Sequence, residues 1–206
     1  MTTAQWNAIA SKPQALEAFD ITQQKPVFVG TTSGINQWYD TTIFTQTNTV
    51  TISNTTSELT TLGTGIGTKT LPANFLTIGK TIRLTIRGYM NETSTPSIRI
   101  RLKYGATTIF DSTAVTINSL GGSDKYFEAV YDITCRTTGA TGTVFPQGRW
   151  QYTTNSGVVT LINGAITSAS TIDTTVSSAL DLTAQWGTAS ASNTINVTNS
   201  TIEILN

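Results

Sequence analysis

Few residues in this 206-residue chain have the types and spacing that enzyme chemistry needs. The chain contains no histidine, which excludes Ser-His-Asp and Cys-His hydrolysis as well as histidine-ligated zinc. Its single cysteine, Cys135, alternates with apolar residues and has no base beside it, so we expect it to fill the core. Two carboxylates are enough for glycoside hydrolysis, but no spacing singles out a pair among Asp111, Asp124, Asp173 and Asp181. We therefore predict that the chain is not an enzyme.

The sequence also lacks a recognisable cofactor or metal loop. The stretch GTGIGTKT, residues 63–70, has glycines followed by a lysine and a threonine. It lacks the spacing of a phosphate-binding loop and no helix follows it, so a β-turn explains it better. No loop is dense enough in acidic residues for calcium. We predict no cofactor and no metal.

Charge gives little indication of a charged partner. The chain has 12 basic and 12 acidic residues and a net charge of zero. Such a chain has no overall field that attracts nucleic acid or an anionic membrane. No apolar run approaches the roughly 20 residues of a membrane helix, and residues 1–20 lack the features of a signal peptide. We expect neither nucleic acid nor membrane as a partner, and synthesis in a cytoplasm.

The basic residues are nevertheless unevenly placed, since six of the twelve lie between positions 80 and 103. In PSIRIRLKYG, residues 96–105, they alternate with apolar residues, as on a strand with one polar and one apolar face. The favoured interpretation is a sheet face that is solvated or salt-bridged. The alternatives are a contact with a neighbouring subunit through Arg99 and Arg101, and an anion or glycan site.

Acidic partners for these arginines are expected on the strand at 126–136. Glu128 and Asp132 occupy its polar positions. If the two strands belong to one sheet, these carboxylates are expected to face Arg99 or Arg101. Each cross-strand pair would contribute about 0.2–1 kcal/mol, so it would set the register more than the stability.

The composition favours β-structure. Charged residues make up 12% of the chain and hydrophobic residues 38%, while threonine accounts for roughly a fifth. Threonine is β-branched and polar, so it suits the water-facing side of a strand. Long helices are not expected, because Ala, Glu, Lys and Leu are few. The length is sufficient for one large β-domain with a sizeable core.

From residue 46 onward, alternating apolar residues indicate about eight to ten strands. A turn is expected at Gly105, and an edge or bulge near Pro146 and Gly148. The apolar parity changes after Val197, which predicts a bulge near Asn199. Many short strands without a fixed repeat predict a sandwich or jelly roll. The expected inward-facing residues are Ile82, Leu84, Ile86, Phe127, Ala129, Tyr131, Ile133, Cys135, Leu180, Leu182, Ala184 and Trp186.

Residues 1–45 differ from the rest and are expected to form an N-terminal arm. TAQWNAIAS, residues 3–11, and KPQALEAF, residues 12–19, suggest two short helices that are not stable alone. The large apolar side chains of the arm must be buried, and we expect another subunit to bury them. The interface residues predicted in the arm are Trp6, Ile9, Leu16, Phe19, Phe28 and Trp38.

Several segments in order resemble a known group of proteins. They are GTGIGTKTLPANFLTIGKTIRLTIRGYM, PSIRIRLKYGATTIFDSTAV, GATGTVFPQGRWQYTT and IDTTVSSALDLTAQWGTASASNTINVTNSTIEIL. This succession of turns and alternating strands is similar to that of jelly-roll virion proteins of tailed bacteriophages and prophages, described as decoration, head-fibre or tail proteins. The resemblance covers roughly residues 45–206, and it carries no motif that marks a functional residue.

The resemblance implies an all-β, jelly-roll-like antiparallel β-sandwich over residues 46–206, with residues 1–45 as a virion-docking arm. It implies a homotrimer that decorates or cements the capsid, or forms a head fibre, with the major capsid protein or another virion protein as partner. The expected location is the virion, assembled in the cytoplasm of the bacterial host. The alternative is a tail-fibre or spike protein that binds host surface glycan, with Trp150 or Tyr152 exposed on a concave face. Burial of Trp150 in the core is the competing interpretation.

Overall fold

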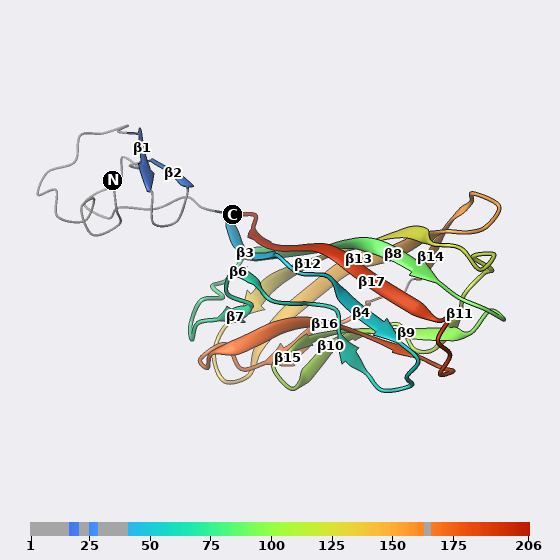
Figure 1. Ribbon diagram of the computed structural model, residues 1–206. Coiled ribbons are helices and arrows are strands. Elements are labelled where there is room, and N and C mark those ends of the chain that lie inside the picture. The colour runs from blue at the N-terminus through green and yellow to red at the C-terminus, as the bar shows by residue number, and fades with distance from the viewer. Residues whose placement is uncertain (1–16, 21–24, 29–40, 163–165) are drawn as a thin grey trace, which may run out of the picture. The chain divides into compact units, whose positions relative to one another are not determined.

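The computed structural model describes residues 17–20, 25–28, 41–162 and 166–206, and it describes side chains from residue 41 onward. The chain divides into two units, Met1–Thr41 and Thr42–Asn206. In the first unit, strands β1 (Glu17–Asp20) and β2 (Lys25–Phe28) form an antiparallel pair (Figure 1). The helix predicted for residues 12–19 is therefore wrong at residues 17–19, whose backbone pairs with β2. The rest of that segment and the other predicted helix lie outside the described residues.

The second unit is a sandwich of two antiparallel sheets, with no helix in its described residues. The strands of the larger sheet are β3 (Thr42–Gln46), β4 (Val50–Ser53), β6 (Gly65–Gly67), β8 (Thr81–Asn91), β12 (Lys125–Thr137), β13 (Gly142–Thr153), β14 (Val159–Ile162), β15 (Ser170–Ile172) and β17 (Thr194–Ile204). The strands of the smaller sheet are β5 (Leu59–Thr60), β7 (Thr70–Leu71), β9 (Ser97–Tyr104), β10 (Thr107–Asp111), β11 (Val115–Thr116) and β16 (Ser178–Trp186).

The chain crosses repeatedly between the sheets, as in a jelly roll (Figure 1). Leaving out the short β6, the chain begins in the larger sheet with β3 and β4 and crosses to the smaller sheet for β5 and β7. It returns to the larger sheet at β8, crosses to the smaller sheet for β9, β10 and β11, and returns again at β12. It ends with β16 in the smaller sheet and β17 in the larger one. As a result β17 lies between β3 and β8, and β16 lies between β5 and β9. Strands β13, β14 and β15 extend the larger sheet beyond β12. The predicted jelly-roll-like sandwich is thus confirmed.

The alternation of the sequence determines which side chains fill the core. All the inward-facing residues predicted on β8, β12 and β16 are buried, each at most 3% exposed. Gly105 forms the turn between β9 and β10 at φ 57°, a conformation that favours glycine. The register of β17 against β8 shifts between Val197 and Asn199, as the change in parity predicted. Pro146 lies in a part of β13 that pairs with β12 but with neither β14 nor β15, so it stands at an edge.

The sandwich has two distinguishable ends. Its first strand begins at Thr42 and not at residue 46, because β3 pairs with β17 and buries Phe44 at 2% exposure. The register pairs Thr42 with Glu203, so the chain enters the sandwich and reaches its last strand residues at one end, here called the basal end. Strand β8 leads from there to the opposite, distal end, which carries the turns at 92–96, 117–124 and 154–158.

Two core tyrosines differ in how their hydroxyl groups are satisfied. The hydroxyl of Tyr152 accepts a hydrogen bond of 2.8 Å from the backbone N–H of Asn118. The hydroxyl of Tyr131 is buried and has no partner within the described part of the chain. Burial also raises the pKa of Tyr131, so the hydroxyl stays protonated.

We expect Tyr131→Phe to leave the free energy of unfolding unchanged or to raise it, because it removes an unpaired buried hydroxyl. Tyr152→Phe should lower that free energy by about 1 kcal/mol, since it leaves the N–H of Asn118 without an acceptor. Urea denaturation of the two variants measures the difference. A larger loss for Tyr131→Phe than for Tyr152→Phe would contradict this view of the core.

Candidate functional site

The arginines of β8 are neutralised on the outer face of the larger sheet. Arg83 donates two hydrogen bonds to the carboxylate of Asp132, from Nε at 2.7 Å and from a terminal nitrogen at 2.8 Å. Arg87 Nε donates to Glu128 Oε1 at 2.9 Å. Both pairs join direct cross-strand neighbours of β8 and β12. They therefore favour the observed register of the two strands.

The basic residues of β9 form a second network, on the outer face of the smaller sheet. Arg99 Nε donates to Asp111 Oδ1 at 2.8 Å. A terminal nitrogen of Arg101 donates to Glu58 Oε2 at 2.6 Å, and Lys103 Nζ lies 3.3 Å from Glu58 Oε1. Arg101 Nε also contacts Asp111 at 3.2 Å, so two carboxylates link all three cations. The salt-bridged face favoured by the sequence pattern is present.

The condition under which Glu128 and Asp132 would face the β9 arginines is not met. Glu128 and Asp132 belong to β12 in the larger sheet, whereas β9 belongs to the smaller sheet, so they do not pair with Arg99 or Arg101. The reason is topological, because the chain crosses from one sheet to the other between β8 and β9. Alternation assigns a side chain to an inner or outer face, but it does not say to which of two sheets the strand belongs.

The interface residues predicted from the sequence are described to different extents. The side chains of Arg99 and Arg101 are described, and both are engaged in the β9 network, with 39% and 14% of the side chain exposed. Phe19 lies in β1 and Phe28 in β2. The remaining predicted interface residues, Trp6, Ile9, Leu16 and Trp38, lie outside the described residues. The interface role of the whole set stays a prediction.

The aromatic residues expected to bind a glycan are in the core. Trp150 is fully buried and stacks on Phe127 with ring centroids 4.5 Å apart, and Tyr152 is 2% exposed. The interpretation of Trp150 as a core residue is confirmed, and the exposure that the glycan-binding alternative required is wrong, because both residues lie on the inner face of β13. Tyr89 and Tyr126 are exposed instead, as direct cross-strand neighbours on the outer face of the larger sheet. The parity of β8 and β12 already assigns both to that face.

Most of the residues considered for catalysis are buried or hydrogen-bonded within the fold. Asp181 accepts a hydrogen bond of 2.6 Å from Thr60, and burial raises the pKa of its carboxyl group. Asp173 accepts a bond of 2.8 Å from the backbone N–H of Thr175 within its own turn. Cys135 is fully buried, and burial raises the pKa of its thiol. Across the described residues, no group of three or more His, Cys, Asp or Glu side chains is placed to hold a metal ion.

Three exposed apolar side chains lie at the basal end, on segments joined by hydrogen bonds. Ile78, Val176 and Leu205, here called the basal apolar group, are 71%, 47% and 44% exposed. Loop 72–80, which contains Ile78, receives a hydrogen bond from Asn206 at 3.0 Å and gives one to Thr174 at 2.8 Å. The group therefore forms part of one continuous end of the sandwich.

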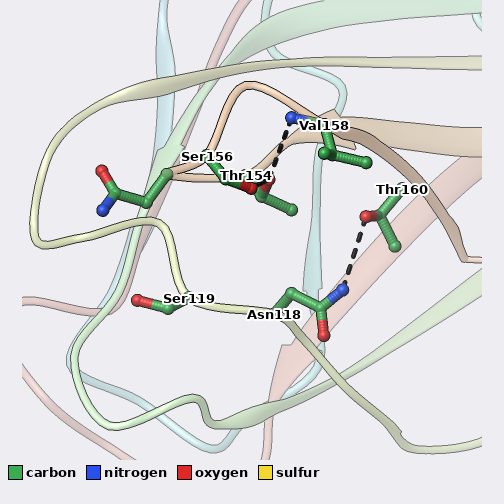
Figure 2. Close-up of a pocket in the computed structure, with 7 residues that line it drawn as sticks. Asn118, Ser119, Thr154, Ser156, Val158 and Thr160 are labelled. Atoms are coloured by element: carbon green, nitrogen blue, oxygen red, sulfur yellow. Dashed lines mark hydrogen bonds between the residues drawn. The ribbon is translucent and has the colours of Figure 1, made fainter.

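The distal end carries a hollow of about 400 Å³, here called the distal hollow. Figure 2 shows the hairpin between β13 and β14 on one side of it and the loop at 118–119 on the other. Its lining residues are Asn118, Ser119, Thr154, Asn155, Ser156, Val158 and Thr160. A smaller hollow of about 220 Å³ lies beside Arg99 and Gln185 on the smaller sheet.

No protein-family model, curated protein or solved structure matches this chain. The structure holds no helix, within the residues that it describes, long and apolar enough to cross a membrane.

The β9 network makes the stability of the fold depend on acidity. The hydrogen bond from Arg99 is the main cause that lowers the pKa of Asp111 from 3.8 to about 2. A carboxyl group whose pKa is depressed in the folded state stabilises the fold at pH values above its unfolded pKa. That contribution is lost as the pH falls from about 4 through about 2.

We expect Asp111→Asn to lower the urea midpoint near neutral pH, because Arg99 and Arg101 lose their shared carboxylate. The difference from the unchanged protein should shrink as the pH falls from about 4 to about 2. Asp124→Asn, at an exposed position outside the network, is the control for loss of one negative charge. A stability difference that is independent of pH over this range would contradict the assignment.

Proposed function

We propose that this chain is a structural protein of a bacteriophage virion. In this proposal it forms a trimer of jelly rolls that decorates or cements the capsid, or builds a head fibre, and its N-terminal residues attach it to the particle. The observation that carries the proposal is the jelly-roll topology of residues 42–206, preceded by a separate N-terminal unit. This is the architecture that the resemblance to tailed-phage virion proteins implies.

The surfaces of the sandwich support a structural role. The arginines of β8 and β9 are paired with carboxylates of the same chain, so these two strands leave little positive charge for a polyanionic partner. The polar outer faces are rich in threonine, which suits an exposed β-surface. The described part of the chain holds no group of three or more His, Cys, Asp or Glu side chains placed for a metal ion, and its single cysteine is buried.

The basal end is the proposed side of attachment, and the major capsid protein or another virion protein is the proposed partner. The chain enters the sandwich there, and the basal apolar group lies there. Burying one large aliphatic side chain contributes about 1.5–3 kcal/mol, and a trimer would present three copies of the group. Attachment at this end leaves the distal end facing away from the particle.

Removal of residues 1–41 should abolish association with virions. The remaining residues 42–206 contain a complete core, so they should stay folded and soluble. Co-sedimentation with particles purified from the source of the sequence measures the association, and light scattering on a sizing column measures whether the truncated chain is a trimer. Equal occupancy of particles by the full and truncated chains would refute attachment through the N-terminal unit.

Substitution of the basal apolar group should weaken association without unfolding the sandwich. We expect Ile78→Ser, Val176→Ser and Leu205→Ser together to reduce particle affinity at least about tenfold, because they remove apolar area that docking would bury. The matched control is Val159→Ser with Leu161→Ser, which alters equally exposed residues on β14. An effect of the control as large as that of the basal variant would argue against a specific basal contact.

A further inference from the structure

The distal hollow is lined by uncharged residues, unlike the smaller hollow, which is lined in part by Arg99. Its volume, about 400 Å³, falls within the roughly 300–1,000 Å³ of small-molecule sites. None of its lining residues is ionisable, and all except Val158 carry a hydroxyl or carboxamide group. The outer faces of β8 and β9, in contrast, carry ion pairs. We propose that the distal hollow is a binding site for an uncharged saccharide.

The chemistry of the lining favours a ligand with many neutral hydroxyl groups. A carboxamide and a hydroxyl group each offer donors as well as acceptors, which matches the alternating demands of neighbouring sugar hydroxyls. A phosphate, carboxylate or ammonium group would lose hydration in the hollow without meeting an opposite charge. The methyl groups of Val158 supply an apolar contact for the C–H groups of a sugar ring.

Several polar atoms of the hollow have hydrogen-bonding capacity to spare. The side-chain amide of Asn155 makes no hydrogen bond within the described residues. Asn118 Nδ2 donates to Thr160 Oγ1 at 3.5 Å, the bond drawn as a dashed line in Figure 2. The carboxamide oxygen of Asn118 makes no hydrogen bond within the described residues, so it can accept one from a ligand. The hydroxyls of Thr154 and Ser156 bond to each other at 3.0 Å, so one of the two protons remains to be donated.

The two walls of the hollow are joined before any ligand arrives. The backbone N–H of Asn155, on the hairpin, donates to the carbonyl of Ser119, on the loop, at 2.9 Å. The loop is also held by the core, because the backbone N–H of Asn118 donates to the buried hydroxyl of Tyr152. Binding therefore requires little ordering of the walls, which favours affinity.

A buried carboxylate and a glycine complete this support. Glu92, 2% exposed, accepts a hydrogen bond of 2.8 Å from the N–H of Leu120 in the same loop. Gly121 has φ 72°, and a Cβ atom at this position would clash with the side-chain amide of Asn155. Glycine thus permits the close approach of loop and hairpin that shapes the hollow.

Binding of saccharides to the purified full-length chain tests the inference. The probes are an array of neutral mono- and oligosaccharides, with sialylated and phosphorylated saccharides and a short uncharged peptide as competitors, and titration NMR then measures affinity. We expect at least one neutral saccharide to bind and to perturb backbone signals of residues 118–121 and 154–160. This result does not depend on virion attachment, so it can fail or succeed independently of the proposed function.

Variants connect any binding to the hollow. Asn118→Ala and Asn155→Ala should each weaken saccharide binding at least about tenfold, and Val158→Trp should abolish binding by filling the hollow. Asn199→Ala, an exposed asparagine on β17 outside the hollow, is the matched control and should have no effect. Thermal unfolding establishes that the variants are folded. Three results would overturn the inference: no neutral saccharide binds, the hollow variants bind as the control does, or a charged saccharide or the peptide binds in preference.

Discussion

The apolar layer between the two sheets is the interaction on which the rest of the molecule depends. Strands β8, β12 and β17 of the larger sheet and β9 and β16 of the smaller one bury every second side chain against it. Each fully buried aliphatic side chain contributes about 1.5–3 kcal/mol, far more than any single surface pair. The layer also contains the buried indole groups of Trp150 and Trp186, whose N–H groups lack partners within the described part of the chain. Their large apolar area outweighs this cost.

The polar features of the molecule follow from this layer. Because one face of each strand is buried, the basic and acidic side chains of β8, β9 and β12 are confined to the outer faces, where they form ion pairs that favour one register. Because the strands run from end to end, the turns that connect them collect at the basal and distal ends. The sheet faces therefore stabilise the fold, and the two ends carry the surfaces that we propose to meet partners.

Much of the sandwich could be predicted from the sequence, because strand periodicity is a local property. The alternation within β8 needs no knowledge of distant residues: Ile82, Leu84 and Ile86 are buried as their spacing indicates. The bulge before Asn199 was visible as a change in parity. What could not be predicted was which strands share a sheet, so the ion-pair partners of Arg99 and Arg101 could be given only on the condition that β9 and β12 do.

The distal hollow could not be predicted from the sequence either, for a similar reason. Its walls come from residues 118–119 and 154–160, which are brought together only by the folding of β12 and β13. Asparagine, serine and threonine are so common in this chain that no single one attracts attention. The exposed pair Tyr89 and Tyr126, in contrast, carried a signal that parity alone could have revealed.

The central claim is that this jelly roll is a building block of a phage particle. Cryo-electron microscopy of particles purified from the source of the sequence tests it most directly. The account predicts density on the virion surface into which three copies of residues 42–206 fit around a three-fold axis, with the basal end toward the particle and the distal end toward solvent. Particles that contain the protein in no ordered position, or that carry it with the distal end buried against the shell, would contradict the account.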